Sequence, residues 1–154
     1  MHKIITITLN PALDKSTKVG HVVPEKKLRC EEPVFEPGGG GLNVSRAIKK
    51  LGGESCAWFL AGGPTGQMLE QLMETEGVAT WTVKTKNWSR ENLMVMETTT
   101  GNQYRFGMPG PETYEEEWLQ CLDKLEKMPS DEIPAYVVAS GSLPPGVPDD
   151  FYLR

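Results

Sequence analysis

The chain has 154 residues with 38% hydrophobic and 24% charged residues and a formal net charge of −5, values typical of one soluble globular domain. The negative charge and the lack of a Lys/Arg run argue against nucleic-acid binding, and no apolar run is long enough to cross a bilayer. Three unclustered cysteines and two histidines predict neither a disulfide framework nor a metal site, and they favour a reducing cytoplasm.

The predicted elements alternate between strands and helices along the chain. An alternating apolar pattern predicts a first strand over residues 3–9, which lacks the features of a signal peptide. Further strands are predicted over residues 55–61, 78–83 and 136–140, the first and last of them buried, and helices over 43–51, 64–76 and from a capping box at 113–116. This order predicts an α/β fold with a Rossmann-like parallel sheet and crossover helices.

The apolar spacing also predicts which helix faces are hydrophobic. In the first helix, one apolar face is formed by Val44, Ala47, Ile48 and Leu51. In the helix after the capping box, we expect four side chains to point inward, namely Trp118, Leu119, Leu122 and Leu125. A last helix begins within residues 149–154.

Two segments depart from this order of strands and helices. Residues 15–35 hold short extended runs, and residues 90–106 form a predicted hairpin that turns at Thr100-Gly101-Asn102. Together they predict a small antiparallel β flap, or lid, from about residues 15–37 and 88–108. Its exposed apolar side chains are typical of a packing face or a dimer surface.

A run of four glycines, Gly38 to Gly41, comes directly before Asn43 and the first predicted helix. Such a backbone leaves main-chain N–H groups open to a ligand. The run matches neither a P-loop, which needs Lys after the glycines, nor a dinucleotide fingerprint, whose last glycine would fall on Asn43. A neutral cradle with a carboxamide suits hydroxyl groups better than a dianion.

Several polar residues follow predicted strands and should meet at the carboxyl edge of the sheet: Asn10, Asp14, the glycine run, Ser140 and Ser142. Asp14 has the chemistry to accept hydrogen bonds from two sugar hydroxyls. The flap segments carry cations suited to a phosphate group, namely Lys27, Arg29, Arg90 and Arg105. The pattern predicts a site for a phosphorylated sugar, with no residue of this chain standing out as a nucleophile or general base.

Three motifs, in order and spacing, resemble those of the PfkB/ribokinase family of carbohydrate kinases: residues 8–14, the cradle over 38–43, and residues 140–146. The similarity extends over residues 1–154. Gly40 stands where many members carry Lys. At Gly40 and at residues 28–30, 33–37 and 104–106, the sequence resembles most closely the branch of minor-isoform 6-phosphofructokinases. The resemblance implies a ribokinase-like fold.

The resemblance also implies a role for each matched position. Sugar hydroxyls would be held by Asp14, Gly38, Gly39 and Asn43, and the crevice would be lined by Ser140 and Ser142. Phosphate would be bound by Arg90 and Arg105, with Lys27 contributed by the neighbouring subunit's flap in a homodimer. The implied reaction transfers the γ-phosphoryl of MgATP, with Mg2+ as the metal, to the C1 hydroxyl of fructose 6-phosphate. Kinases of tagatose 6-phosphate or fructose 1-phosphate remain alternatives.

One departure from the family pattern concerns the catalytic base. The family carries this base in a Gly-Ala-Gly-Asp motif of its second half, and these 154 residues contain no such motif. We therefore expect the chain to be the N-terminal part of one ribokinase-like domain, without the nucleotide site and inactive by itself. The alternative from a different class is a non-catalytic sugar-phosphate-binding or dimerisation module.

Overall fold

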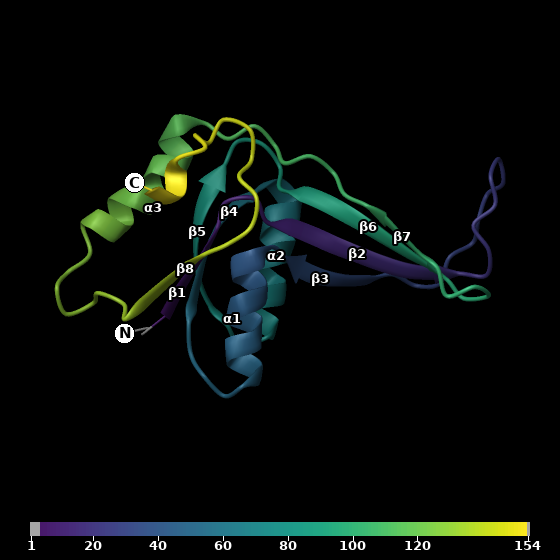
Figure 1. Ribbon diagram of the computed structural model, residues 1–154, viewed down its shortest axis with the longest axis horizontal. Coiled ribbons are helices and arrows are strands. Elements are labelled where there is room, and N and C mark those ends of the chain that lie inside the picture. Colours follow the sequence, from purple (N-terminus) through teal and green to yellow (C-terminus); the bar gives the residue numbers. More distant parts are fainter. Residues whose placement is uncertain (1–3, 154) are drawn as a thin grey trace.

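The computed structural model describes residues 4–153, which form two four-stranded sheets. The first sheet has the order β5-β4-β1-β8, from Ala79–Thr85, Cys56–Gly62, Ile4–Thr8 and Tyr136–Ala139, and every pair in it is parallel. The second sheet has the order β3-β2-β6-β7, from Val34–Gly38, Ala12–Val19, Arg90–Glu97 and Gln103–Phe106. Figure 1 shows this second sheet, the flap, extending away from the α/β body.

Three helices cover the parallel sheet on both faces. Helices α1 (Gly40–Lys50) and α2 (Gly63–Thr75) lie on one face, and α3 (Glu115–Glu126) lies on the other (Figure 1). Alternate residues of β4 supply the two cores. Ala57 and Phe59 pack toward α1 and α2, whereas Trp58 and Leu60 pack toward α3. The predicted α/β fold with a parallel sheet and crossover helices is confirmed.

The proline and glycine positions that predicted the ends of α2 and the turn of the hairpin agree with the structure. Pro64 lies in the first turn of α2, and Gly77 follows its end with a φ of 69°. Strands β6 and β7 pair antiparallel, and Gly101 in the turn between them has a φ of 76°.

The helices over residues 4–153 are too short and too polar to cross a bilayer.

The flap is a mixed sheet, which corrects the prediction of an antiparallel one. Its two central strands, β2 and β6, run parallel, and the outer strands β3 and β7 are antiparallel to them. A parallel neighbour requires a long crossover, and here the whole segment from β3 to β5 makes that connection. Local spacing around the hairpin cannot reveal such a pairing.

Helix α1 begins three residues earlier than predicted and buries a different face. Leu42 and Ser45 are buried, whereas Ala47 is exposed and Leu51 is 88% exposed. The Ser45 hydroxyl lies 2.8 Å from the Thr6 hydroxyl and accepts a hydrogen bond from Ser55 at 2.9 Å. A buried serine is acceptable here because its hydroxyl is satisfied on both sides. The apolar pattern missed this face because its central residue is polar.

Two further predictions of burial are wrong. Strand β8 pairs only with β1 in the part of the chain that the structure describes, and Tyr136 is 68% exposed at this edge. In α3 the N-cap is Tyr114, one residue later than predicted, and the Glu117 carboxylate accepts the Tyr114 N–H at 2.8 Å. Leu119 on this helix is exposed, contrary to the prediction, whereas Trp118 is buried as predicted.

The hydroxyl cluster under α1 gives a stability prediction. The substitution Ser45→Ala leaves the buried Thr6 and Ser55 hydroxyls without their shared partner, and we expect it to lower the free energy of unfolding by about 1–3 kcal/mol. Urea unfolding followed by circular dichroism measures this change. The matched substitution Ser130→Ala, at an exposed serine, should leave the midpoint unchanged. Equal midpoints for the two variants would contradict the prediction.

Candidate functional site

A groove of about 230 Å³ lies on one face of the flap sheet. Asp14 on β2 faces Glu36 on β3 and Asn92 on β6 in the strand register, and Arg105 on β7 faces Met94. Residues two apart along a strand share a face, so all of these side chains lie on the same side of the sheet. The groove therefore combines carboxylates, an amide and a guanidinium, and these groups can bind both hydroxyls and an anion.

The Asp14 carboxylate is held on two sides. Asn92 donates a hydrogen bond from Nδ2 to Oδ1 at 2.9 Å. The backbone of Gly38 lies against the other oxygen, because a Cβ added at residue 38 would lie 2.2 Å from Oδ2. Any larger residue at this position would displace the carboxylate. Asp14 and Gly38 thus meet as predicted.

The glycine run packs against the chain's own atoms. A Cβ at Gly40 would lie 2.4 Å from the Ser140 hydroxyl, and one at Gly41 would lie 2.8 Å from the Ile7 carbonyl oxygen. Gly39, the N-cap of α1, has a φ of 127°, which other residues rarely adopt. The prediction that the run exposes bare backbone to a ligand is therefore incomplete, since close packing also requires these glycines.

The predicted ligand Asn43 lies in the first turn of α1 rather than before the helix. Its N–H donates to the Gly39 carbonyl at 2.9 Å, and the N–H of Leu42 donates to the Thr8 hydroxyl at 3.1 Å. The exposed side chain of Asn43 accepts a weak hydrogen bond from Arg46 on Oδ1 at 3.4 Å. Its Nδ2 donors point to no acceptor that the structure records, which suits a hydroxyl ligand.

Arg90 connects the flap to the α/β body. Its two terminal nitrogens donate to the Met108 carbonyl at 3.0 Å and to the Asn10 carbonyl at 3.2 Å. Asn10 in turn donates from Nδ2 to the Ser142 hydroxyl at 3.0 Å. Arg90 Nε and Asn10 Oδ1 are buried, and no hydrogen-bond partner is recorded for either atom among residues 4–153. Two predicted ligands, Arg90 and Ser142, are therefore joined through Asn10.

Lys27 lies apart from the other predicted ligands. It is exposed on the loop over residues 20–33, which connects β2 to β3 at the far end of the flap (Figure 1). At about 3.3 Å per residue, the strand from Asp14 to Val19 spans about 17 Å before this loop begins. Lys27 is not among the residues that line the groove.

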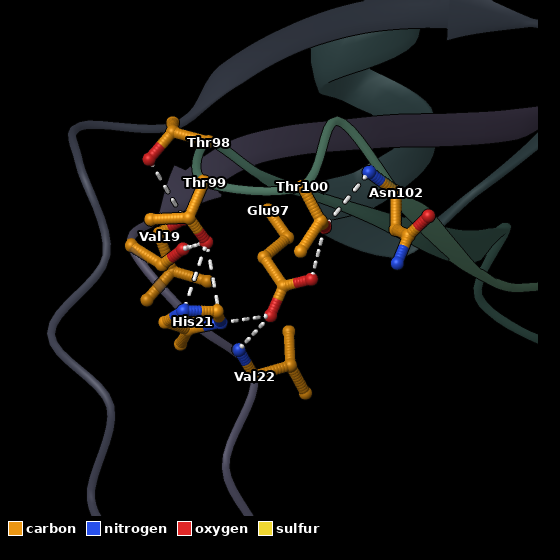
Figure 2. A network of polar contacts seen from close by, with 9 residues as sticks. Val19, His21, Val22, Glu97, Thr98, Thr99, Thr100 and Asn102 are labelled. Carbon is orange, nitrogen blue, oxygen red and sulfur yellow. Dashed lines mark hydrogen bonds and ion pairs between the residues drawn. The ribbon is translucent and has the colours of Figure 1, made fainter.

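The base of this loop is fixed by Glu97, a buried residue that the sequence patterns did not indicate. Figure 2 shows its carboxylate accepting hydrogen bonds from the Val22 N–H at 2.8 Å, from His21 at 2.8 Å, and from the Thr100 hydroxyl. The Thr100 hydroxyl, together with Val22 and His21, lowers the pKa of Glu97 to about 2. At the other end of the loop, Glu31 hydrogen-bonds to Lys18 and Thr17. The loop is therefore anchored at both ends.

The described residues do not fit a metal site. No group of three or more His, Cys, Asp or Glu side chains gathers within residues 4–153. Mg2+ prefers carboxylates together with substrate phosphates.

The chain resembles known proteins along nearly its whole length. The profile described as "pfkB family carbohydrate kinase" matches residues 4–154. The ATP-dependent 6-phosphofructokinase isozyme 2 of Escherichia coli is 50% identical over 147 residues, which cover 96% of this chain and 47% of that protein. The D-tagatose-1-phosphate kinase of Bacillus licheniformis is 31% identical over 150 residues, covering 97% of this chain and 47% of that protein.

Solved structures show the same similarity. The crystal structure of phosphofructokinase-2 from Escherichia coli in complex with fructose-6-phosphate matches with a TM-score of 0.89 and 47% identity, covering 99% of this chain and 49% of that one. A structure of the tetrameric inhibited form of the same enzyme matches with a TM-score of 0.88, 48% identity and coverage of 98% and 49%. The chain spans about half the length of the curated relatives it matches.

The Glu97 network predicts how acid affects the flap. The pKa of Glu97 is lowered from 4.5 to about 2 in the fold, so its contribution to stability is complete above pH 4.5 and is lost as the pH falls toward 2. The wild-type melting temperature should therefore exceed that of Glu97→Gln at pH 6, and the difference should shrink below pH 4.5. Glu25→Gln, in the exposed middle of the same loop, is the control and should follow the wild type. A difference between wild type and Glu97→Gln that stays constant from pH 6 to pH 2 would refute this assignment.

Proposed function

The chain belongs to the pfkB family of carbohydrate kinases, and on this basis we propose that it forms the sugar-phosphate-binding half of an ATP-dependent 6-phosphofructokinase. The resemblance drawn from the three sequence motifs is thereby confirmed at the level of the family. The proposed reaction transfers the γ-phosphoryl of MgATP to the C1 hydroxyl of fructose 6-phosphate.

The observation that carries this proposal is the groove shared by Asp14 and Arg105. A carboxylate accepts hydrogen bonds from hydroxyls, and a guanidinium pairs with a phosphate. A ligand that satisfies both groups at once has hydroxyls on one part and a phosphate on another, as a sugar phosphate does. The 50% identity to a 6-phosphofructokinase supports fructose 6-phosphate in particular.

The remaining predicted ligands surround this groove and take supporting roles in the proposal. Gly38 and Gly39 present backbone to the sugar beside Asp14, and Asn43 offers the donors of its amide. Ser140 lies against Gly40, and Ser142 is held by Asn10. Arg90 contributes positive charge next to Asn10 while its terminal nitrogens hold two carbonyls.

Lys27 is proposed to complete the site of a second copy. Its loop is anchored at both ends and is exposed between them, and Lys27 does not line the groove of its own chain. A homodimer formed through the flaps would place this cation at the neighbouring site. The relative from Escherichia coli is reported in a tetrameric form, which supports association of such chains.

Related substrates form the second candidate function. The 31% identity to a D-tagatose-1-phosphate kinase shows that this half of the fold is shared by enzymes named for different sugar phosphates. D-tagatose 1-phosphate therefore belongs in the same binding series, together with tagatose 6-phosphate and fructose 1-phosphate, the two alternatives considered from the sequence. A non-catalytic sugar-phosphate-binding module would bind the same sugar phosphates but would neither bind ATP nor transfer its phosphoryl group.

The binding proposal is tested with Asp14→Asn, which keeps the shape of the side chain but removes its charge. Because hydrogen bonds to a charged group contribute about 1.5–3 kcal/mol, we expect the affinity for fructose 6-phosphate to fall about 10-fold to 100-fold. Calorimetric titration of the chain measures this change. Asp123→Asn, at an exposed aspartate of α3, is the matched control and should bind as the wild type does. Equal affinities for Asp14→Asn and wild type would remove Asp14 from the site.

A second experiment concerns catalysis by these 154 residues alone. The family's catalytic base belongs to a Gly-Ala-Gly-Asp motif that the sequence does not contain, and phosphoryl transfer needs positioned metal and charge around the moving phosphoryl. We expect no formation of ADP above background with MgATP and fructose 6-phosphate. The readout is a coupled enzymatic assay of the purified chain. Turnover that disappears in Asp14→Asn would show that a base exists within these residues.

A further inference from the structure

Asn92 uses both ends of its side-chain amide. Its Nδ2 donates to Asp14 Oδ1 at 2.9 Å, and its Oδ1 accepts the N–H of Met108 at 3.0 Å. The opposite orientation of the amide would set oxygen against carboxylate and NH2 against N–H. Both neighbours therefore fix the same orientation.

Two side chains of β6 bind the backbone N–H and the backbone carbonyl of Met108. Asn92 binds its N–H, and Arg90, two residues earlier on β6, donates to its carbonyl at 3.0 Å. The Arg90 guanidinium also donates to the Asn10 carbonyl, and Asn10 donates to Ser142. A continuous chain of hydrogen bonds thus runs from Asp14 on the flap to Ser142 after β8 in the α/β body.

We propose that Asn92 is a positioning residue that holds the Asp14 carboxylate toward the groove and couples it to Arg90. This inference rests on the proposed sugar-phosphate function. With Oδ1 taken by Asn92 and Oδ2 against Gly38, the carboxylate has one orientation when the ligand arrives. Preorganisation of this kind increases affinity because the ligand does not have to order the side chain. Hydroxyl recognition by Asp14 and phosphate recognition beside Arg90 are then set at a fixed spacing.

The chemistry of this position favours asparagine over its nearest analogue. Aspartate at residue 92 would keep an acceptor for the Met108 N–H but would place a second carboxylate against Asp14. Alanine would remove both contacts and leave the Met108 N–H without this acceptor. The variants Asn92→Asp and Asn92→Ala therefore separate the two hydrogen bonds.

A double-mutant cycle with fructose 6-phosphate tests the coupling through Asp14. Asn92→Ala should weaken binding about tenfold in the wild-type background, the loss expected for a hydrogen bond to a charged group. In the Asp14→Ala background it should weaken binding less than about threefold, because the group that it positions is gone. Asn92→Asp should bind more weakly than Asn92→Ala. Equal losses in both backgrounds would mean that Asn92 contacts the sugar independently, and would overturn the proposal.

Hydrogen exchange at the Met108 N–H tests the same coupling without a ligand. Asn92→Ala should speed this exchange about tenfold, and Asp14→Ala should speed it about threefold although Asp14 does not touch Met108. Asn92→Asp keeps the acceptor and should stay within about twofold of the wild type. Lys18→Ala, at an exposed lysine of the same strand as Asp14, is the control and should leave the rate unchanged.

The two measurements distinguish a failure of the proposed function from a failure of the proposed role of Asn92. A wild-type chain that does not bind fructose 6-phosphate counts against the proposed function, and the exchange rates then decide the role of Asn92 by themselves. A Met108 exchange rate that is the same in Asp14→Ala and Lys18→Ala would overturn the coupling, whatever the affinity for sugar.

Discussion

The close approach of α1 to the ends of β1 and β8 sets the position of the glycine run and of Asn43 relative to Ser140. A Cβ at Gly41 would lie 2.8 Å from the Ile7 carbonyl oxygen, and one at Gly40 would lie 2.9 Å from the Ser140 carbonyl carbon. Backbone atoms cannot move aside as a flexible side chain can, so any side chain here would push the helix away from the sheet. Asn43 and Ser140 would then separate, because one sits on the helix and the other follows the strand.

A single arginine fixes the other side of this junction. Arg46 on α1 donates to both carboxylate oxygens of Glu76 after α2, at 2.8 and 2.9 Å, and to the Pro37 carbonyl at 3.0 Å. Its side chain is only 13% exposed, and the Glu76 carboxylate raises its pKa. A paired and largely buried guanidinium of this kind resists displacement, since removing one partner would leave the other without its hydrogen bonds. The end of β3, where Gly38 meets Asp14, is thereby tied to both helices.

The sequence predicted the parts of the fold that depend on local pattern. Alternation predicted β1, a buried apolar run predicted β4, the Pro and Gly signals predicted the ends of α2, and the glycine run indicated the junction at the start of α1. Features that depend on partners distant in sequence were missed. The buried face of α1 centres on Ser45, whose partners Thr6 and Ser55 are known only from the fold. Asn92 lies opposite Asp14 only through the parallel pairing of β2 with β6, which no local spacing indicates.

Strand β6 contributes residues to both polar networks of the flap, the one around Asp14 and the one around Glu97. Its first residues, Arg90 and Asn92, contact the groove side of the flap, and its last residue, Glu97, holds the loop that carries Lys27. Eight consecutive residues of β6 pair in parallel with eight of β2, so the register that sets Asn92 opposite Asp14 also sets Glu97 opposite Val19. A slip of one residue would turn every side chain of the strand to the other face of the sheet. The same strand pairing therefore sets both the position of Asn92 beside Asp14 and the position of Glu97 at the base of the loop that carries Lys27.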